Sequence, residues 1–465
     1  MNQKKLHILA DMPVQQAILH LAIPTMLGMV VQIFYNITDT FFVGKLNDPN
    51  QVAAVAIIMP IFMMLMALSG IFGNGGASYL SRLLGQKDYE TAQQTLATAW
   101  FSCVILGITV TILGLWGMPT ILALSGASEQ TGPFAAAYLR IILIGSVIIM
   151  VNFCAGQLLR AEGAAKEAMF GMVIGTVTNI VLDPVFIFGL RQGVAGAAIA
   201  TVIANAIAFA YYLSYYIRRK SLIPLAWKSV RCRWALYKEI TKVGIPASVN
   251  QLLMSSSHIL VNNIAASYGD IVVAAMGIDM RIFTIPIMLS IGLAVGSQPL
   301  IGYSYGAKNL SRLKASVKLA AAMATSIVTI FTVLFALFPK QLIRIFIQDP
   351  AVISTGTTIL YAMLIGLPFI GFQMVMMNTF QAMGKGLPAL LVSLSRQGII
   401  FVPAILLLNT FFGFSGFIYA QAVADVLTVL FSATLFLRLI AEVERRAAHP
   451  FVSQKVALCS DEGAY

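Results

Sequence analysis

Long apolar stretches separated by short polar segments dominate this chain. A helix needs about 20 apolar residues to cross the hydrocarbon core of a bilayer, and twelve stretches come close to that length or exceed it. The pattern therefore predicts an all-α polytopic membrane protein with twelve transmembrane helices. The predicted spans are 17–43, 52–79, 92–115, 134–158, 168–189, 194–217, 240–267, 271–298, 317–338, 357–380, 388–411 and 414–439.

The composition agrees with a membrane protein. Hydrophobic residues make up 59% of the chain and charged residues 10%, and the mean hydropathy is +0.86. Soluble domains carry about a quarter charged residues. The segment before the first span lacks a long apolar stretch with a cleavage site, so we expect that span to stay in the mature protein. The four cysteines show neither a disulfide framework nor a metal-binding spacing.

The net charge of +12 is distributed unevenly. With both termini inside, only four of the 30 basic residues fall in outer loops and three within spans, as the positive-inside rule predicts. We therefore expect a membrane protein with cytoplasmic termini, and no nucleic-acid partner. The densest basic run lies between spans six and seven, which suggests a linker between two lobes. The predicted organisation is a lobe over 1–217, a cytoplasmic linker over 218–239, a second lobe over 240–440 and a cytoplasmic tail over 441–465.

The two halves resemble each other. "GGASYLSRLLGQKD" from Gly75 aligns with "GSQPLIGYSYGAKN" from Gly296 at an offset of 221 residues. Six crossings return the chain to its starting side, so the repeats share an orientation and are related by a pseudo-two-fold axis along the membrane normal. Two such six-helix lobes around a cleft are typical of transporters. The same offset, within one residue, relates Gly85 to Gly306, Gly145 to Gly366, Gly163 to Gly384 and Pro24 to Pro246.

Four of the 18 acidic residues fall within predicted spans: Asp39, Asp183, Asp279 and Asp425. A charge at the centre of a membrane helix costs at least ~2.5 kcal/mol, so these residues are functional candidates. Asp39 and Asp183 each lie shortly before the outer end of a span, and Thr201 of the sixth span lies at a similar depth. Three helices therefore bring polar groups to one level of the first lobe.

Spacing within each helix supports a cluster. Residues three or four positions apart share a helix face, and three such pairs occur here. A lone asparagine in a membrane helix usually only joins neighbouring helices, but two carboxylates beside several amides and a hydroxyl can hold a proton or a hard cation. The predicted coupling residues are Asn36 and Asp39, Asn179 and Asp183, and Thr201 and Asn205.

The second half lacks this cluster. At the repeat offset, Asp183 corresponds to Ala404. Asp279 has Arg281 close by in sequence, and either a structural ion pair or contact with a cationic substrate would explain it. Asp425 fits best as a hydrogen-bonded packing residue.

Four segments resemble the multidrug and toxic compound extrusion (MATE) family. They are "AIPTMLGMVVQIFYNITDTFFVG", "NIVLDPVFIFG", "GVAGAAIATVIAN" and "GSQPLIGYSYGAKN". The resemblance implies a two-lobed antiporter that exports mostly cationic amphiphilic drugs against protons or sodium, and hence a role in antibiotic resistance. It also implies that the first-lobe cation site of the prokaryotic branch maps onto Asp39, Asn179, Asp183 and Thr201, with the backbone carbonyl of Ala197. Another branch of the family carries a glutamate in the seventh helix. The chain matches that branch less well, because the only titratable residue at this place in the seventh predicted span is His258.

Further expectations concern the cleft and the first helix. Pro24 removes a backbone hydrogen bond and loosens span one. It produces either a static kink or, as the resemblance implies, a bend that follows protonation. The residues expected to line the substrate cleft are Gln32, Met63, Met66, Asn152, Gln157, Asp279 and Arg281.

Two questions have alternative answers: which ion is coupled to transport, and which class of transporter the chain forms. We favour the proton because two carboxylates share one cavity, whereas Asn179 and Thr201 add the neutral oxygens that suit sodium. A flippase for a lipid-linked precursor would need a basic cleft, yet only Arg140, Arg281 and Arg396 lie within spans. An uncoupled channel is a more distant alternative. We expect a monomer in the lipid bilayer that is not an enzyme, needs no cofactor and has no nucleotide-binding loop.

Overall fold

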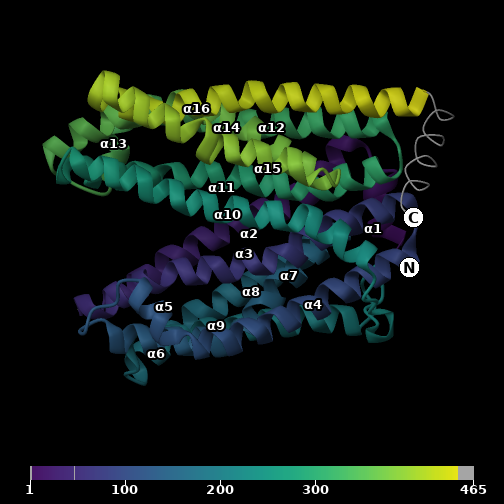
Figure 1. Ribbon diagram of the computed structural model, residues 1–465, viewed down its shortest axis with the longest axis horizontal. Coiled ribbons are helices and arrows are strands. Elements are labelled where there is room, and N and C mark those ends of the chain that lie inside the picture. Colours follow the sequence, from purple (N-terminus) through teal and green to yellow (C-terminus); the bar gives the residue numbers. More distant parts are fainter. Residues whose placement is uncertain (1–2, 47, 449–465) are drawn as a thin grey trace, which may run out of the picture.

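The computed structural model describes residues 3–46 and 48–448, and most of these residues are helical. The tail predicted for 441–465 lies mostly outside these residues. Long helices run side by side along the longest axis of the molecule (Figure 1). The first lobe contains α1 (Gln3–Ala10), α2 (Val14–Gly44), α3 (Pro49–Gln86), α4 (Tyr89–Trp116), α5 (Met118–Leu124), α6 (Gly132–Ile144), α7 (Ser146–Ala161), α8 (Ala165–Pro184), the π-helix η1 (Val185–Gly189) and α9 (Gly193–Ile217).

The second lobe repeats this arrangement. After a connection with a short 3-10 turn, η2 (Trp227–Ser229), the chain enters the first helix of this lobe six residues before the predicted boundary at 240. The second lobe contains α10 (Trp234–Ser267), α11 (Asp270–Gly306), α12 (Leu310–Leu337), α13 (Pro339–Arg344), α14 (Pro350–Ala382), α15 (Gly386–Leu394), the π-helix η3 (Ser395–Ile399) and α16 (Phe401–Ala448).

One crossing is bent, and two crossings share the last helix. By length and hydropathy, nine described helical segments are able to cross a membrane, and α6 with α7 forms a tenth that is bent by 54°. The bend falls at Gly145, where a methyl group would lie 2.4 Å from a methyl carbon of Val202. Gly413, at φ +57°, divides α16 into parts of two crossings. With this division and with α10, the described chain provides the twelve predicted crossings.

The two lobes meet at the end of the molecule where both termini lie, and their helices diverge toward the other end (Figure 1). The contact depends on glycine. A methyl group on Gly85 would lie 2.1 Å from the carbonyl oxygen of Tyr303, and one on Gly306 would lie 2.0 Å from that of Arg82. These two contacts exchange under the 221-residue repeat, so the pseudo-two-fold axis passes between α3 and α11.

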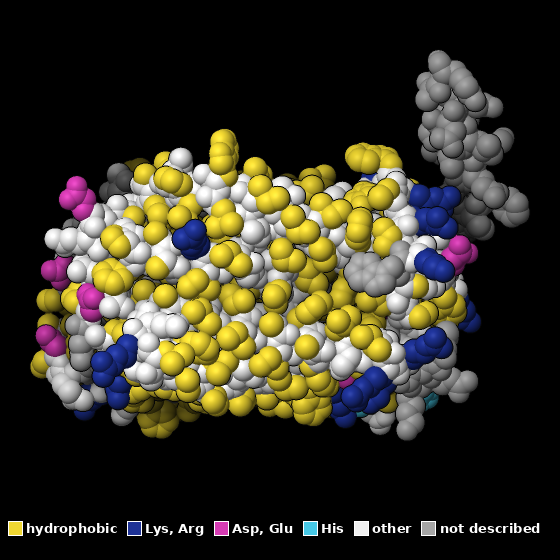
Figure 2. Space-filling view, turned by 90° about the horizontal axis from the view of Figure 1, so that it is seen from below, with side chains coloured by type: hydrophobic (Ala, Val, Ile, Leu, Met, Phe, Trp, Pro, Cys, Tyr) yellow, Lys and Arg dark blue, Asp and Glu magenta, His cyan; other side chains and the backbone are white. Residues whose placement is uncertain are grey.

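Charged groups gather at the two ends of the molecule. On the face shown in Figure 2, hydrophobic side chains cover the middle. Most Lys and Arg side chains on this face lie at the end that holds the chain termini, and most Asp and Glu side chains lie at the opposite end. The apolar middle has the character of a lipid-facing belt.

Candidate ion-coupling site

A buried carboxylate, amide and hydroxyl meet between α8 and α9. The side-chain nitrogen of Asn179 donates to Asp183 Oδ1 at 3.3 Å and lies 3.5 Å from Thr201 Oγ1. All three residues are buried. The four-residue spacing places Asn179 and Asp183 on one face of α8, and α9 packs against that helix and supplies the hydroxyl. These three predicted residues therefore form one unit.

The hydrogen bonds continue toward the middle of the lobe. Asn205 donates through its side chain to the backbone carbonyl of Thr201 at 2.8 Å, and it accepts from the side chain of Asn152 at 2.9 Å. Asn152 lies on α7. The structure thus places this residue in the polar network that extends from the carboxylate, although we predicted it to line the substrate cleft.

Asp39 approaches the unit from α2. Its side chain is half-buried, and it interacts electrostatically with Asp183. Asn36, predicted to belong to the same group, is exposed, and its backbone carbonyl accepts from the hydroxyl of Thr40 at 2.8 Å. Asp39 therefore completes a pair of carboxylates, whereas no hydrogen bond links the Asn36 side chain to the cluster among the described residues.

Two tyrosines lie beside the carboxylates and were not predicted from the sequence. Tyr35 on α2 interacts with Thr201 and with both carboxylates, and Tyr138 on α6 interacts with both carboxylates as well. Tyr35 lies four residues before Asp39, so the helical spacing could have revealed it. Tyr138 has no such neighbour, and nothing in the apolar run around it indicates its role.

The unit leaves two oxygen acceptors unused. Asn179 Oδ1 and Asp183 Oδ2 are buried and accept no hydrogen bond from any described residue. Buried acceptors are nearly always paired, so these atoms suit a bound proton or cation. Ala197 is buried one helical turn before Thr201, and the π-helix η1 begins directly after Pro184. Such π-turns frequently occur at functional sites.

The second lobe uses its buried charges differently. Asp425 on α16 accepts from Arg396 Nε at 3.0 Å and from the Gln421 side chain at 3.2 Å. The Asp425 side chain is 1% exposed and that of Arg396 11%. The carboxylate is thus neutralised by an internal ion pair, which agrees with the packing role expected for it.

Asp279 is buried alone. Both its carboxylate oxygens lack a hydrogen-bond partner among the described residues, and a methyl group on Gly356 would lie 3.8 Å from one of them. Arg281 is exposed and forms no ion pair with it in the described chain. Residues two apart on a helix point in nearly opposite directions, so the structure does not support the ion pair, which was one of the two alternatives for Asp279.

Of the remaining cleft candidates, Gln32 is exposed on α2, while Met66 and Gln157 are half-buried. Met63 bridges the lobes, because its sulfur lies 4.0 Å from the side-chain nitrogen of Gln251 on α10. Gln157 lines a small cavity together with Gln298 of the second lobe. The first-lobe candidates other than Asn152 therefore either face the second lobe or are accessible.

Pro24 lies where α2 contacts the second lobe. It is buried within an unbroken helix. On the facing helix α11, a methyl group on Gly292 would lie 2.7 Å from Met26 Cα, and one on Gly296 would lie 2.6 Å from Ala22 Cα. A change in the bend of α2 at this proline would therefore displace the contact between the lobes.

Comparisons with known proteins agree with the repeat and with the two-lobed fold. The family model described as MatE matches residues 24–185 and, a second time, residues 246–407. The multidrug export protein MepA of Staphylococcus saprophyticus is 31% identical over 433 residues, covering 92% of this chain and 95% of that protein. MepA of Staphylococcus aureus is 30% identical with the same coverage. A solved outward-facing multidrug resistance MATE family transporter of the MOP superfamily superposes with a TM-score of 0.91 at 27% identity, covering 96% of this chain and all of that one.

Proposed function

Because this chain belongs to the MATE family, we propose that it exports cationic amphiphilic drugs in exchange for an inward flow of protons. The protein is a multidrug efflux transporter of the membrane and not an enzyme. The observation that supports ion coupling is the buried Asp183–Asn179–Thr201 unit beside Asp39, with its two unused acceptors. Such a unit is suited to take up one positive charge at a time.

The mechanism uses the two lobes as alternating gates. In the described conformation the lobes are closed at the end with the termini, where glycines allow the backbones of α3 and α11 to touch. Uptake of a proton by the Asp39–Asp183 pair removes negative charge beside α2. This change permits α2 to bend near Pro24, which reshapes the lobe contact and expels the drug outward. Each proton that moves inward contributes ~2.3 kcal/mol per 100 mV of membrane potential.

The orientation is part of the proposal. We place the end with both termini in the cytoplasm of a bacterial cell, because basic side chains gather there (Figure 2). The protein then acts as a monomer whose drug path lies between the lobes, near Gln32, Met63 and Met66. Asp279 is buried within the second lobe, so a direct contact with a drug requires a rearrangement of that lobe.

A lipid flippase is the weaker alternative. Such a protein needs free basic groups in its cleft to hold phosphate. Of the three arginines predicted within spans, Arg396 is paired with Asp425. Arg140 and Arg281 are exposed on the helices α6 and α11. The membrane-embedded arginines thus offer little support for phosphate binding.

The test is drug efflux from reconstituted vesicles with one ion gradient imposed at a time. A pH gradient alone should drive efflux against the drug gradient, and the Asp183→Asn variant should remove this response. Efflux that needs a sodium gradient and ignores pH would overturn the proton assignment. Sodium coupling would then explain why neutral oxygens of Asn179 and Thr201 accompany the carboxylates.

A further inference from the structure

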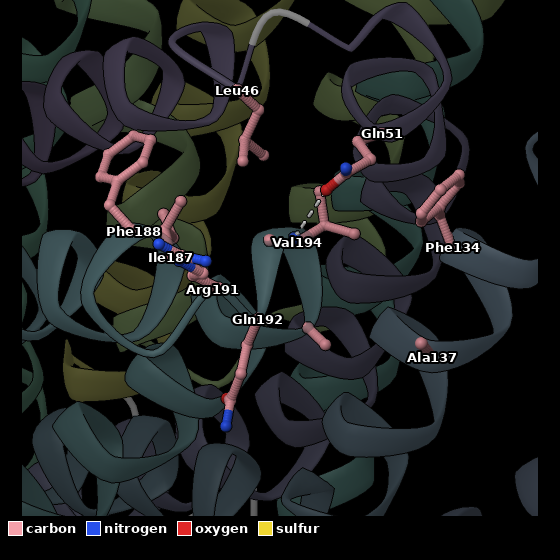
Figure 3. Close-up of a pocket in the computed structure, with 11 residues that line it drawn as sticks. Leu46, Gln51, Phe134, Ala137, Ile187, Phe188, Arg191, Gln192 and Val194 are labelled. Carbon is pink, nitrogen blue, oxygen red and sulfur yellow. Dashed lines mark hydrogen bonds between the residues drawn. The ribbon is translucent and has the colours of Figure 1, made fainter.

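A cavity of about 420 Å³ opens at the end of the first lobe that lies opposite the termini. Its walls come from the turn after α2, the starts of α3 and α6, η1, and the turn into α9. In Figure 3, Leu46 and Gln51 point from one side toward Val194, and Phe188 and Phe134 lie on opposite sides of the space. The cavity belongs to one lobe only, so it is distinct from the path between the lobes.

The cavity lies directly above the ion-coupling site. Four segments bring a side chain to the site and, four or seven residues farther out, a side chain to the cavity. In α6 and α9 both side chains lie on one helix, whereas Leu46 lies in the turn after α2 and Ile187 in η1, which follows α8. Within a helix, spacings of four and seven return to the same face, and they correspond to about 6 and 10 Å along it. The pairs, with the site residue first, are Asp39 and Leu46, Tyr138 and Phe134, Asp183 and Ile187, and Thr201 and Val194.

A thin apolar layer separates the cavity from the carboxylates. Val43, Ile187, Val194 and Ala197 form a small buried cluster of their own, against which Tyr138 packs. Ile187 and Val194 also line the cavity, so the layer is about one side chain thick. An apolar constriction of this kind closes a pore by excluding water and opens when it becomes wet.

A hydrogen bond braces the mouth of the cavity. Gln51 Oε1 on α3 accepts from the backbone N–H of Val194 at 3.2 Å (Figure 3). The Gln51 side-chain nitrogen donates to Asp48 at 3.0 Å. Gly193 adopts φ +56°, and a methyl group there would lie 2.3 Å from Gln51 Oε1. The close approach therefore requires glycine. The cavity is large enough for about a dozen waters at ~30 Å³ each.

We propose that this cavity is a vestibule through which the coupling cation, a hydrated proton or sodium ion, reaches Asp39 and Asp183 from outside. The inference rests on the proposed function and adds a separate path for the ion. The apolar layer is its gate, and the π-helix η1, which carries Ile187, links the gate directly to Asp183. A separate path lets the ion arrive while a drug still occupies the space between the lobes.

The charge at the mouth predicts a secondary effect. Arg191 lines the cavity and is exposed, so it disfavours nearby cations without blocking them, because solvent and salt screen its charge. Arg191→Gln should therefore accelerate ion-driven efflux at low ionic strength, with the difference disappearing at high salt. A rate unaffected by this substitution at low salt would count against passage of a cation by this route.

The principal test blocks the vestibule chemically. Ala137→Cys places a thiol on the cavity wall, and Thr358→Cys places one at the corresponding repeat position of the second lobe, which is also exposed. Both variants are reconstituted in vesicles with the outer end accessible, and bulky membrane-impermeant methanethiosulfonate reagents are applied there. Labelling of Ala137→Cys should slow gradient-driven efflux about tenfold, as blocking a pore does. Labelling of Thr358→Cys should leave it within twofold of the unlabelled rate, and drug affinity at fixed pH should be unchanged in both.

Two results would overturn the vestibule. One is efflux by labelled Ala137→Cys at the unlabelled rate, and the other is a loss of drug affinity equal to the loss of rate, which would assign the cavity to the drug path. Val194→Phe, which thickens the apolar layer without any reagent, should reproduce the slow efflux. Failure of the unmodified protein to couple efflux to any ion gradient would refute the proposed function, whereas normal coupling with no effect of the label refutes the vestibule alone.

Discussion

The two lobes share one scaffold, but their hydrogen-bonded carboxylates, Asp183 and Asp425, are satisfied in opposite ways. In the first lobe, hydrogen bonds lead from Asn152 through Asn205 and Thr201 to Asn179, which donates to Asp183. One side-chain oxygen of Asn179 and one of Asp183 accept no hydrogen bond from any described residue. In the second lobe, Arg396 and Gln421 satisfy Asp425 within the lobe itself. The first arrangement can exchange a charge with its surroundings, and the second is already neutral.

The packing between the lobes shows no such difference. The Gly85–Tyr303 and Gly306–Arg82 contacts are copies of each other. A methyl group added to Gly85 would lie 2.1 Å from the facing carbonyl oxygen of Tyr303, and one added to Gly306 would lie 2.0 Å from that of Arg82. Symmetry is therefore retained in the contact between the lobes, and it is lost at the proposed ion-coupling site. The family model matching both halves at nearly one offset agrees with a duplicated scaffold.

The largest effect should come from the first-lobe carboxylates. Asp39→Asn and Asp183→Asn preserve side-chain shape but remove the carboxylates that we propose to take up a proton, so gradient-driven drug efflux should fall to the passive rate. Ala404→Ser, at the repeat position of Asp183, is the matched control and should retain transport. Uphill efflux by Asp183→Asn, measured in reconstituted vesicles, would show that the lobes do not differ as described.

The second-lobe ion pair should affect stability and not coupling. Arg396→Leu leaves Asp425 charged and unpaired, and breaking a buried pair in this way costs about 3–5 kcal/mol. The double variant Arg396→Leu, Asp425→Leu removes both charges and should recover most of that loss in thermal unfolding. It should also retain ion-driven efflux; a stable double variant without coupling would place part of the ion chemistry in the second lobe.

The glycine contacts test the symmetric part of the comparison. Gly85→Ala and Gly306→Ala each force a methyl group against a backbone carbonyl, so each should destabilise the closed end of the molecule by about 1–3 kcal/mol. Their effects on thermal unfolding should be equal because the contacts are reciprocal. Gly132→Ala is the control, since a methyl group there meets no atom within 4 Å. Clearly unequal effects would contradict the pseudo-two-fold contact.

Hydropathy and residue spacing were enough to predict the fold and part of the site. The twelve spans follow from the length of the apolar stretches, and counting inward from the outer ends placed Asp39, Asp183 and Thr201 at one depth. Asn179 and Asp183 share a helix face because of their four-residue spacing. These features depend on local geometry, which a sequence pattern encodes directly.

Features that depend on packing between distant segments could not be predicted. Arg396 and Asp425 come from different helices, so no helical spacing links them. Tyr138 joins the site only because α6 packs beside α9, and the bend at Gly145 follows from the close approach of Val202. Asn152 was predicted to line the substrate cleft, yet its side chain donates to Asn205 and so belongs to the polar network of the first lobe.

The last prediction concerns the loop that follows α7. Glu162 is buried there and accepts from the Tyr216 hydroxyl at 3.0 Å, the Leu222 N–H at 3.1 Å and the Ser221 hydroxyl. The corresponding repeat position holds Met383, which is 1% exposed. The first lobe thus buries a titratable group where the second lobe buries an apolar one, so only the first-lobe loop should respond to pH.

Burial raises the pKa of Glu162 from its ordinary value of 4.5 to about 7. A folded-state pKa above the unfolded one means that the folded protein binds this proton more tightly. The resulting stabilisation is complete below pH 4.5 and is lost as the pH rises through 7, by at most about 3 kcal/mol. Glu162→Gln cannot titrate, so its thermal unfolding temperature should decrease less between pH 5 and pH 8 than that of the unaltered protein. Because Asp39 and Asp183 are common to both proteins, the difference between the two pH profiles isolates Glu162, and parallel profiles would refute its titration in this range.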